Sequence, residues 1–235
     1  TRYVNEQSYS QFNKFDCVVL LTDSDRKKAD YQTKIAVIPN TLLQSQTDIS
    51  PLQALKTISV GRLDKLKNHI DQIEVWAQIV IDYPKWTLHI YGDGPEKDNL
   101  QQAIVEKGLE NNIFLEGICS DLSTIYNSAS LFLFTSRAEG FGMVLIEAMA
   151  AGVPCISYDC PCGPSEIIDD GINGYLIPVG DTTMMVEKAK ELIGNSSKRK
   201  QMGDAAFEKS KQFLPQNIMP RWELLLESLL QKKNL

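Results

Sequence analysis

Hydrophobic and polar positions follow two alternating periods along most of the chain. Short runs rich in β-branched and aromatic residues predict strands, and longer stretches in which apolar residues recur every three or four positions predict helices. The predicted strands cover residues 57–60, 86–91, 112–115, 130–135, 154–158 and 174–177. The predicted helices cover residues 68–81, a stretch that ends near 107, and residues 121–127, 143–151, 182–193 and 196–211. Repeated β-α-β units predict an α/β fold, a Rossmann-like parallel sheet with helices on both faces.

The helix predicted at residues 68–81 carries one apolar stripe. Ile70, Ile73, Ala77 and Val80 recur at three- and four-residue steps. Because residues at this spacing lie on one face of a helix, we expect the stripe to pack on the sheet.

The two ends of the chain differ from this pattern. Residues 15–21 and 34–38 predict two strands joined by a charged helical stretch at 23–31, and residues 216–230 predict a helix whose apolar side contains Ile218, Trp222, Leu225, Leu226 and Leu229. The polar residues 40–50 predict a linker. We therefore expect three parts: residues 1–50, the remnant of another domain with its linker; residues 51–213, a complete Rossmann-like domain; and residues 214–235, a C-terminal helix.

Composition narrows the class of protein. The chain has 235 residues, 43% of them hydrophobic, and no apolar run near the roughly 20 residues that span a bilayer. A net charge of −6 argues against non-specific nucleic-acid binding. The first residues lack the apolar segment of a signal peptide, and five cysteines are an odd number, which favours reduced thiols in the cytoplasm. Cys160 and Cys162 lack a second pair of ligands at similar spacing, so we expect no metal site.

Two strand-to-helix loops carry candidate chemistry, because ligands of open parallel sheets bind at the carboxyl ends of the strands. The first loop places Gly61, Arg62 and Lys67 ahead of a helix. A phosphate bound there would meet a guanidinium, an ammonium and the helix dipole together. An ordinary solvated loop explains the same residues equally well, so the spacing alone leaves both interpretations open.

The second loop follows the strand predicted at residues 130–135. Gly140 and Gly142 bracket a turn that opens an apolar helix, so the backbone amides nearby predict a seat for an anion. Glu139 stands at the edge of this loop, and Glu147 lies about one turn into the helix. Two carboxylates that flank an anion seat suit the recognition of sugar or ribose hydroxyls. The apolar neighbours of Glu147 make a plain surface acid the weaker interpretation.

Four motifs then occur in one order along the chain. They are Gly61-Arg62 with Lys67, then Tyr91-Gly92-Asp93-Gly94-Pro95, then Glu139 and Glu147 around Gly140-Phe141-Gly142, and finally Glu166-Ile167-Ile168 before Asn173-Gly174. From about residue 15 to residue 210 the chain resembles a family 4 retaining glycosyltransferase of the GT-B type. This resemblance implies a C-terminal nucleotide-sugar-binding domain joined to the end of an N-terminal acceptor domain, on which the last helix packs back. Residues 159–166 resemble a loop of bacterial enzymes that build surface polysaccharides and lipid-linked oligosaccharides.

The resemblance implies a role for each site residue. Arg62 and Lys67 would neutralise the donor diphosphate and Glu139 would bind hydroxyls of the donor sugar, so these three are the expected catalytic residues. Glu147 would bind the ribose, and Ile118 would lie at the edge of the nucleobase. The remaining expected donor-binding residues form the diphosphate seat: Gly61, Phe141, Gly142, Met143 and Val144. Neither a metal nor another cofactor is expected, because two cations and a helix terminus take its place.

The implied reaction transfers a hexosyl unit with retention from a nucleotide diphosphate sugar, which we expect to be UDP-linked. The expected partners are this nucleotide sugar, a saccharide or lipid-linked acceptor and the missing N-terminal domain, without nucleic acid. We expect a cytoplasmic protein, at the inner face of the membrane through the absent half, and no transfer by this chain alone. The alternatives are a non-catalytic nucleotide-binding module and an NAD-dependent oxidoreductase. The latter is disfavoured because no Gly-x-Gly-x-x-Gly follows the strand at 57–60.

Overall fold

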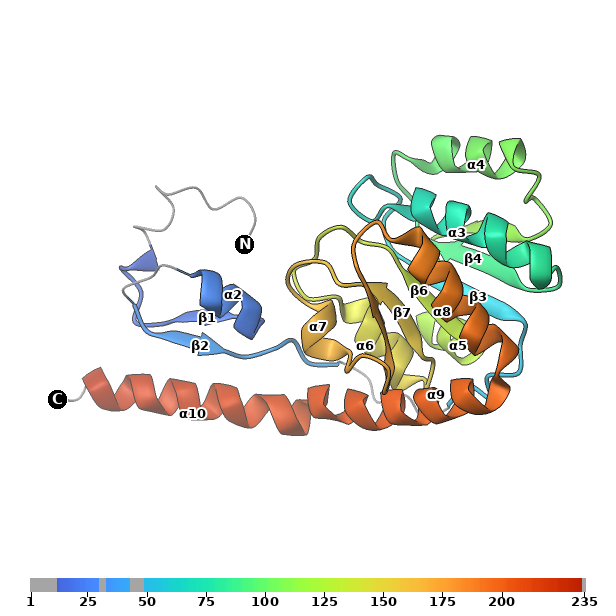
Figure 1. Cartoon of the computed structure of the whole chain (residues 1–235). Coiled ribbons are helices and arrows are strands. Elements are labelled where there is room, and N and C mark those ends of the chain that lie inside the picture. Colours follow the sequence, from blue (N-terminus) through green and yellow to red (C-terminus); the bar gives the residue numbers. More distant parts are fainter. Residues whose placement is uncertain (1–11, 30–32, 43–48, 234–235) are drawn as a thin grey trace. The chain divides into compact units, whose positions relative to one another are not determined.

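A computed structural model of the chain describes residues 12–29, 33–42 and 49–233. The chain divides into two compact units, one formed by residues 46–210 and the other by residues 1–45 together with 211–235. Figure 1 shows the larger unit as a sheet between helices. The smaller unit contains a two-stranded sheet, a short helix and a long C-terminal helix. Each unit has its own cluster of buried apolar side chains.

The larger unit contains a six-stranded sheet in the order β5-β4-β3-β6-β7-β8. Every neighbouring pair in it is parallel. Its strands are β3 (Lys56–Val60), β4 (Thr87–Tyr91), β5 (Ile113–Gly117), β6 (Leu131–Phe134), β7 (Cys155–Tyr158) and β8 (Gly174–Ile177). Each strand lies within two residues of the bounds predicted from its apolar run. The predicted parallel α/β sheet is therefore confirmed.

Helices cover both faces of this sheet. On one face α3 (His69–Asp82), α4 (Lys97–Glu106) and α8 (Thr182–Gly194) share a cluster of buried side chains with alternate strand residues such as Leu131 and Leu133. On the other face the ring of Phe132 lies 6.1 Å from that of Tyr126 in α5 (Leu122–Asn127). There α6 (Met143–Ala150) also packs against α9 (Ser196–Ser210). The short helix α7 (Pro164–Ile167) was not predicted.

The apolar stripe predicted for α3 is confirmed in part, because Ile73 is buried in the main cluster and Ala77 and Val80 pack against it. Ile70, its first member, is 39% exposed. Two polar residues belong to the buried face, and Gln72 is accommodated because its amide donates hydrogen bonds to the hydroxyls of Ser59 (2.9 Å) and Thr135 (3.0 Å). The residues that α3 buries are His69, Gln72, Ile73, Val75, Trp76 and Ile79.

The order of strands explains where a ligand would bind. β3 and β6 are neighbours at the centre of the sheet, although β4 and β5 lie between them in sequence. The chain runs outward from β3 to β5, crosses back to β6 and then runs outward to β8. The loops after β3 and β6 therefore leave the same edge of the sheet beside each other, where open α/β sheets bind their ligands.

The smaller unit has a core of its own. β1 (Val18–Leu20) and β2 (Ile35–Val37) pair in parallel, with α2 (Asp23–Lys28) between them in the chain. After a single turn, η1 (Lys211–Phe213), α10 (Pro215–Lys233) buries Ile218 and Leu225 against Ile38. Leu226 does not share this face, because it is 54% exposed. Most of the predicted linker at 40–50 lies outside the described residues.

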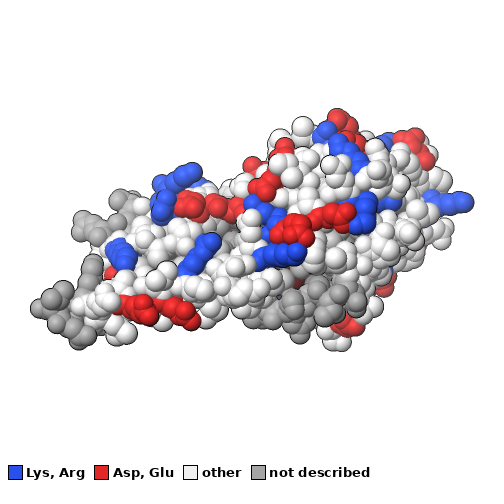
Figure 2. Space-filling model, turned by 90° about the horizontal axis from the view of Figure 1, so that it is seen from below, with Lys and Arg blue, Asp and Glu red and all other residues white. Residues whose placement is uncertain are grey.

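The described residues contain no membrane-spanning helix, and one face of the molecule carries charges of both signs. None of the described helices is both long and apolar enough to cross a bilayer. On the face shown in Figure 2, Lys and Arg alternate with Asp and Glu. Within the described parts of the chain, no three His, Cys, Asp or Glu side chains gather as they would around a metal ion.

Candidate functional site

The loop between β3 and α3, residues 61–68, is held in shape by its own polar groups. The carboxylate of Asp64 accepts hydrogen bonds from the backbone amides of Leu66 (3.0 Å) and Lys67 (2.9 Å). Asn68, the N-cap of α3, has φ 55° and ψ 45°, a left-handed conformation that Asn adopts more readily than most residues. The backbone from which Lys67 projects is thus fixed on both sides.

Glycines in the neighbouring loop after β4 allow the β3–α3 loop to approach. A Cβ atom at Gly92 would lie 1.9 Å from the carbonyl oxygen of Gly61, and one at Gly94 would lie 2.4 Å from that of Leu63. Gly92 also has φ 146°, in the region that favours glycine. The Gly-Asp-Gly-Pro motif at residues 92–95 therefore positions the backbone of the β3–α3 loop.

Lys67 and Glu139, which come from two different loops, form an ion pair. Lys67 Nζ lies 2.5 Å from Glu139 Oε1, and the two side chains are 24% and 9% exposed. The ammonium also lies 5.8 Å from the centre of the Phe134 ring, at the end of β6. Because the pair is largely shielded from water, its attraction is stronger than that of an exposed pair. The fold thus places a cation beside a carboxylate at the carboxyl ends of β3 and β6.

The N-terminus of α6 lies in the same loop as Glu139. Gly142 is its N-cap, with φ 96° and ψ 50°, and the amides of Met143 and Val144 open the helix, where backbone donors have no partner within the helix. The ring of Phe141, in the turn before this helix, is buried. A Cβ at Gly163 would lie 2.0 Å from the Phe141 carbonyl oxygen, so the segment before α7 fixes this turn.

Glu147 is oriented by a tyrosine that the sequence analysis missed. The hydroxyl of Tyr126 donates a hydrogen bond of 2.8 Å to Glu147 Oε2. Burial, together with the adjacent carboxylate, raises the pKa of Tyr126 well above its ordinary value. The phenol therefore stays protonated and keeps its role as a donor. In the sequence Tyr126 is one more aromatic residue of a short helix, and nothing there indicates its partner.

Two of the expected site residues stand apart from these contacts. The side chain of Arg62 is 72% exposed, and its Nε lies 3.9 Å from the carboxylate of Asp64. Ile118, in the loop after β5, is 82% exposed. An exposed guanidinium at this edge of the sheet can turn toward an anion without losing a strong partner, because exposed ion pairs contribute little.

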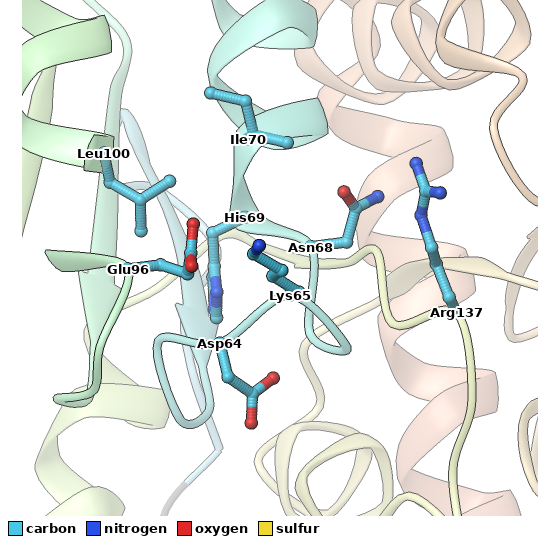
Figure 3. A pocket seen from close by; sticks show the side chains of 8 residues that line it. All are labelled: Asp64, Lys65, Asn68, His69, Ile70, Glu96, Leu100 and Arg137. Atoms are coloured by element: carbon cyan, nitrogen blue, oxygen red, sulfur yellow. The ribbon is translucent and has the colours of Figure 1, made fainter.

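A cavity of about 220 Å³ lies beside the β3–α3 loop. In Figure 3 the imidazole of His69 extends between Glu96 and Lys65. The pKa of His69 is lowered to about 4, mainly by burial, which Asp64 opposes and Lys67 reinforces. His69 is therefore neutral at neutral pH. The cavity is lined by Asp64, Lys65, Asn68, His69, Ile70, Glu96, Leu100 and Arg137.

Comparison with known families agrees with this geometry. Residues 45–209 match the family described as glycosyl transferases group 1. The chain belongs to this family. It is 31% identical, over 95% of its length, to the GtfA subunit of the UDP-N-acetylglucosamine–peptide N-acetylglucosaminyltransferase of Streptococcus gordonii, of which it covers 47%. It is 32% identical, over 93% of its length, to an exopolysaccharide phosphotransferase of Streptomyces coelicolor, of which it covers 24%.

A solved structure extends the agreement to the fold. The pneumococcal O-GlcNAc transferase GtfA, in complex with UDP and GlcNAc, superposes with a TM-score of 0.84 at 27% identity, over 98% of this chain and 48% of that one. The expected GT-B type of α/β fold is thereby confirmed. The chain spans less than half of either curated relative and of this structure. Membership of the glycosyltransferase family speaks against the oxidoreductase alternative.

Proposed function

We propose that this chain is the nucleotide-sugar-binding half of a family 4 retaining glycosyltransferase. The enzyme moves a hexosyl unit from a UDP-linked donor to a saccharide or lipid-linked acceptor in the synthesis of bacterial surface polysaccharide. The observation that carries the proposal is the Lys67–Glu139 pair, which lies in the two loops that leave β3 and β6. Support also comes from pneumococcal GtfA, whose structure holds UDP and GlcNAc.

The proposed chemistry is the departure of a nucleoside diphosphate. Breaking the bond between the sugar and the diphosphate leaves negative charge on the leaving phosphate, and that charge must be stabilised. In the proposal Lys67 and Arg62 supply the two cations, and the first amides of α6 supply oriented dipoles. These groups take the place of a metal ion.

Glu139 binds the sugar in this account. A carboxylate accepts hydrogen bonds from vicinal hydroxyls, and Glu139 lies at the lip of the loop whose turn holds the diphosphate. Donor binding then replaces one strong contact by two, because Lys67 turns from Glu139 to the phosphate while Glu139 turns to the sugar. We do not assign Glu139 as a nucleophile, because double displacement needs two acids that flank one bond.

Glu147 binds the ribose in this account. Tyr126 fixes one of its oxygens, so the orientation of the carboxylate is set before the nucleotide arrives. Ile118 covers the nucleobase, because an exposed apolar side chain at the end of β5 can lie against a flat ring.

Calorimetric titration with UDP, GDP, ADP and their sugar conjugates tests the proposal. We expect UDP to bind, and a UDP-hexose to bind more tightly than UDP. Tighter binding of GDP or ADP would overturn the assignment of the donor base. Equal affinity for UDP and every UDP-sugar would instead favour the non-catalytic nucleotide-binding module.

We further propose that these 235 residues bind the donor but do not transfer sugar. Catalysis by positioning requires both reactants to be held, and the two curated relatives described above are more than twice as long as the part that this chain spans. A radiolabelled UDP-sugar assay with a broad panel of acceptors tests this. Robust product from the 235 residues alone would contradict it.

A further inference from the structure

Asp71, in the first turn of α3, gathers polar partners from three parts of the chain. Its Oδ2 accepts hydrogen bonds from Asn68 Nδ2 (2.6 Å) and from the hydroxyl of Tyr158 (2.9 Å), and it lies 3.9 Å from Nη2 of Arg137. The side chain of Asp71 is 15% exposed, and Tyr158 is fully buried. None of the donor contacts proposed above uses this carboxylate.

The first of these partners holds a strained backbone. Asn68 is left-handed, a conformation that L-residues adopt rarely and Asn more readily than most. It is stabilised by the carboxylate of Asp71 and by the hydroxyl of Thr135, which donates a hydrogen bond of 2.9 Å to the Asn68 carbonyl oxygen. Because Asn68 directly follows Lys67, its conformation determines the direction in which Lys67 leaves the loop.

Another partner of Asp71, Arg137, belongs to the loop after β6, which contacts the β3–α3 loop directly. Arg137 lies two residues before Glu139, and its amide donates a hydrogen bond of 2.9 Å to the carbonyl oxygen of Leu66. Figure 3 shows the Asn68 side chain extending to the side of the cavity on which Arg137 lies. Asp71 thus contacts one residue beside Lys67 and another near Glu139.

We propose that Asp71 is a positioning residue for the diphosphate seat. It keeps Asn68 left-handed and thereby fixes the direction in which the Lys67 side chain leaves the loop toward Glu139. Such supporting contacts matter because a site must be held to within about 0.5 Å to be effective. The inference rests on the proposed function, in which Lys67 receives the diphosphate.

The first experiment compares nucleotide affinity in matched variants. Asp71→Asn should weaken UDP binding roughly tenfold, since it removes the charge that holds the Asn68 amide. Glu74→Gln is the control, because it makes the same change one turn further along α3, at a residue that pairs with Lys107 at 2.9 Å on the surface. We expect Glu74→Gln to leave UDP affinity unchanged. Equal affinity in wild type and Asp71→Asn would overturn the proposal.

Exchange of the two side chains separates positioning from loss of stability. In the double variant Asn68→Asp with Asp71→Asn, an amide at position 71 again meets a carboxylate at 68, and Asp also tolerates the left-handed conformation. We expect this variant to regain most of the lost affinity. Ile79→Val, which trims a buried residue of α3, should lower the melting temperature without changing affinity. Affinity that follows the melting temperature across all variants would contradict a positioning role.

A second variant and nucleotide-free crystal structures cover the cases in which Asp71→Asn does not fold or the wild type binds no nucleotide. If Asp71→Asn does not fold, Asn68→Ala removes the amide that the carboxylate holds, and unchanged UDP affinity in that variant would overturn the inference. If the wild type binds none of UDP, GDP and ADP, the proposed function fails, and nucleotide-free crystal structures decide the inference. In Asp71→Asn we expect Asn68 to leave the left-handed region and Lys67 to part from Glu139. Retention of both features would contradict the proposal.

Discussion

Glu139 and Glu147 belong to one loop and the helix that follows it, yet their partners give them different tasks. Glu139 faces the cation that we assign to the phosphate, at 2.5 Å, whereas Glu147 is held by a phenol at 2.8 Å. A carboxylate whose partner is the ammonium of a long lysine side chain can change partner when a ligand arrives. One that is fixed by a buried Tyr126 keeps its orientation, which suits recognition of a constant part of the ligand.

Because their partners differ, removing the charge of Glu139 and removing that of Glu147 should affect different parts of the donor affinity. Glu139→Gln should leave the affinity for UDP within a factor of about three and abolish the extra affinity of a UDP-hexose, because its partner is the sugar. Glu147→Gln should weaken UDP itself by about tenfold, since hydrogen bonds to charged groups contribute roughly 1.5–3 kcal/mol. Calorimetry with UDP and a UDP-hexose measures both. Equal losses of UDP affinity in the two variants would remove the division of roles.

At the scale of elements, the loops that surround the site are positioned by backbone contact. The loop after β4 touches the β3–α3 loop through Gly92 and Gly94. The segment before α7 touches the turn at Phe141 through Gly163. In each case one loop presses on a carbonyl group of another, so a change far from the ligand can move the residues that bind it.

Gly92→Ala should therefore reduce both stability and nucleotide affinity. Its Cβ would lie 1.9 Å from the carbonyl oxygen of Gly61, so the loop that carries Lys67 must shift. Gly108→Ala is the matched control, because Gly108 also has a positive φ of 66° but a Cβ there meets nothing within 4 Å. We expect thermal unfolding to show destabilisation in both variants, and calorimetry to show weaker UDP binding only in Gly92→Ala. Unchanged UDP affinity in Gly92→Ala would refute this account of the motif.

The elements themselves could be predicted from the sequence because most of them bury one face, and burial leaves a periodic pattern. The strands of the main sheet were found for this reason. The face of α3 was found only in part, because Gln72 is buried by hydrogen bonds that an apolar pattern does not record, and the polar residue His69 is buried as well. The helix at Pro164–Ile167 has four residues and leaves no period to detect.

The residues of the candidate site also differ in whether the sequence alone points to them. Glu139, Glu147 and Lys67 stand out in the sequence as candidates, because they are charged residues in glycine-containing segments that follow apolar runs. Tyr126 and Asp71 were missed, because each acts through a partner far away in the sequence: Glu147 for Tyr126, and Tyr158 and Arg137 for Asp71. Such pairings depend on the strand order, which a single sequence does not specify.

At the scale of the whole molecule, every residue assigned to the site lies within residues 46–210. The larger unit therefore carries the complete set of donor contacts that we propose. The stability of this unit should depend on pH, because it buries an ionisable group that carries no charge at neutral pH. His69 is 3% exposed, and burial lowers its pKa to about 4.

The direction of this pH dependence follows from proton binding. His in an unfolded chain has a pKa near 6.5, so between pH 6.5 and about 4 the unfolded state binds a proton that the folded state does not. The free energy of unfolding should therefore fall as the pH decreases through this window, by up to about 3 kcal/mol. Urea unfolding followed by the fluorescence of the buried Trp76 and Trp86 measures the change. His69→Gln should flatten it, and the same pH dependence in this variant as in the wild type would exclude His69 as the cause.

The central claim is that the loops after β3 and β6 form a seat for a nucleoside diphosphate. Calorimetric titration of UDP into the wild type, Lys67→Ala and Lys65→Ala tests it most directly. The last two variants remove the same charge from one loop, but only Lys67 pairs with Glu139. We predict that the wild type and Lys65→Ala bind UDP with similar affinity, and that Lys67→Ala binds roughly 10- to 100-fold more weakly. Equal UDP affinity in Lys67→Ala and the wild type would contradict the account.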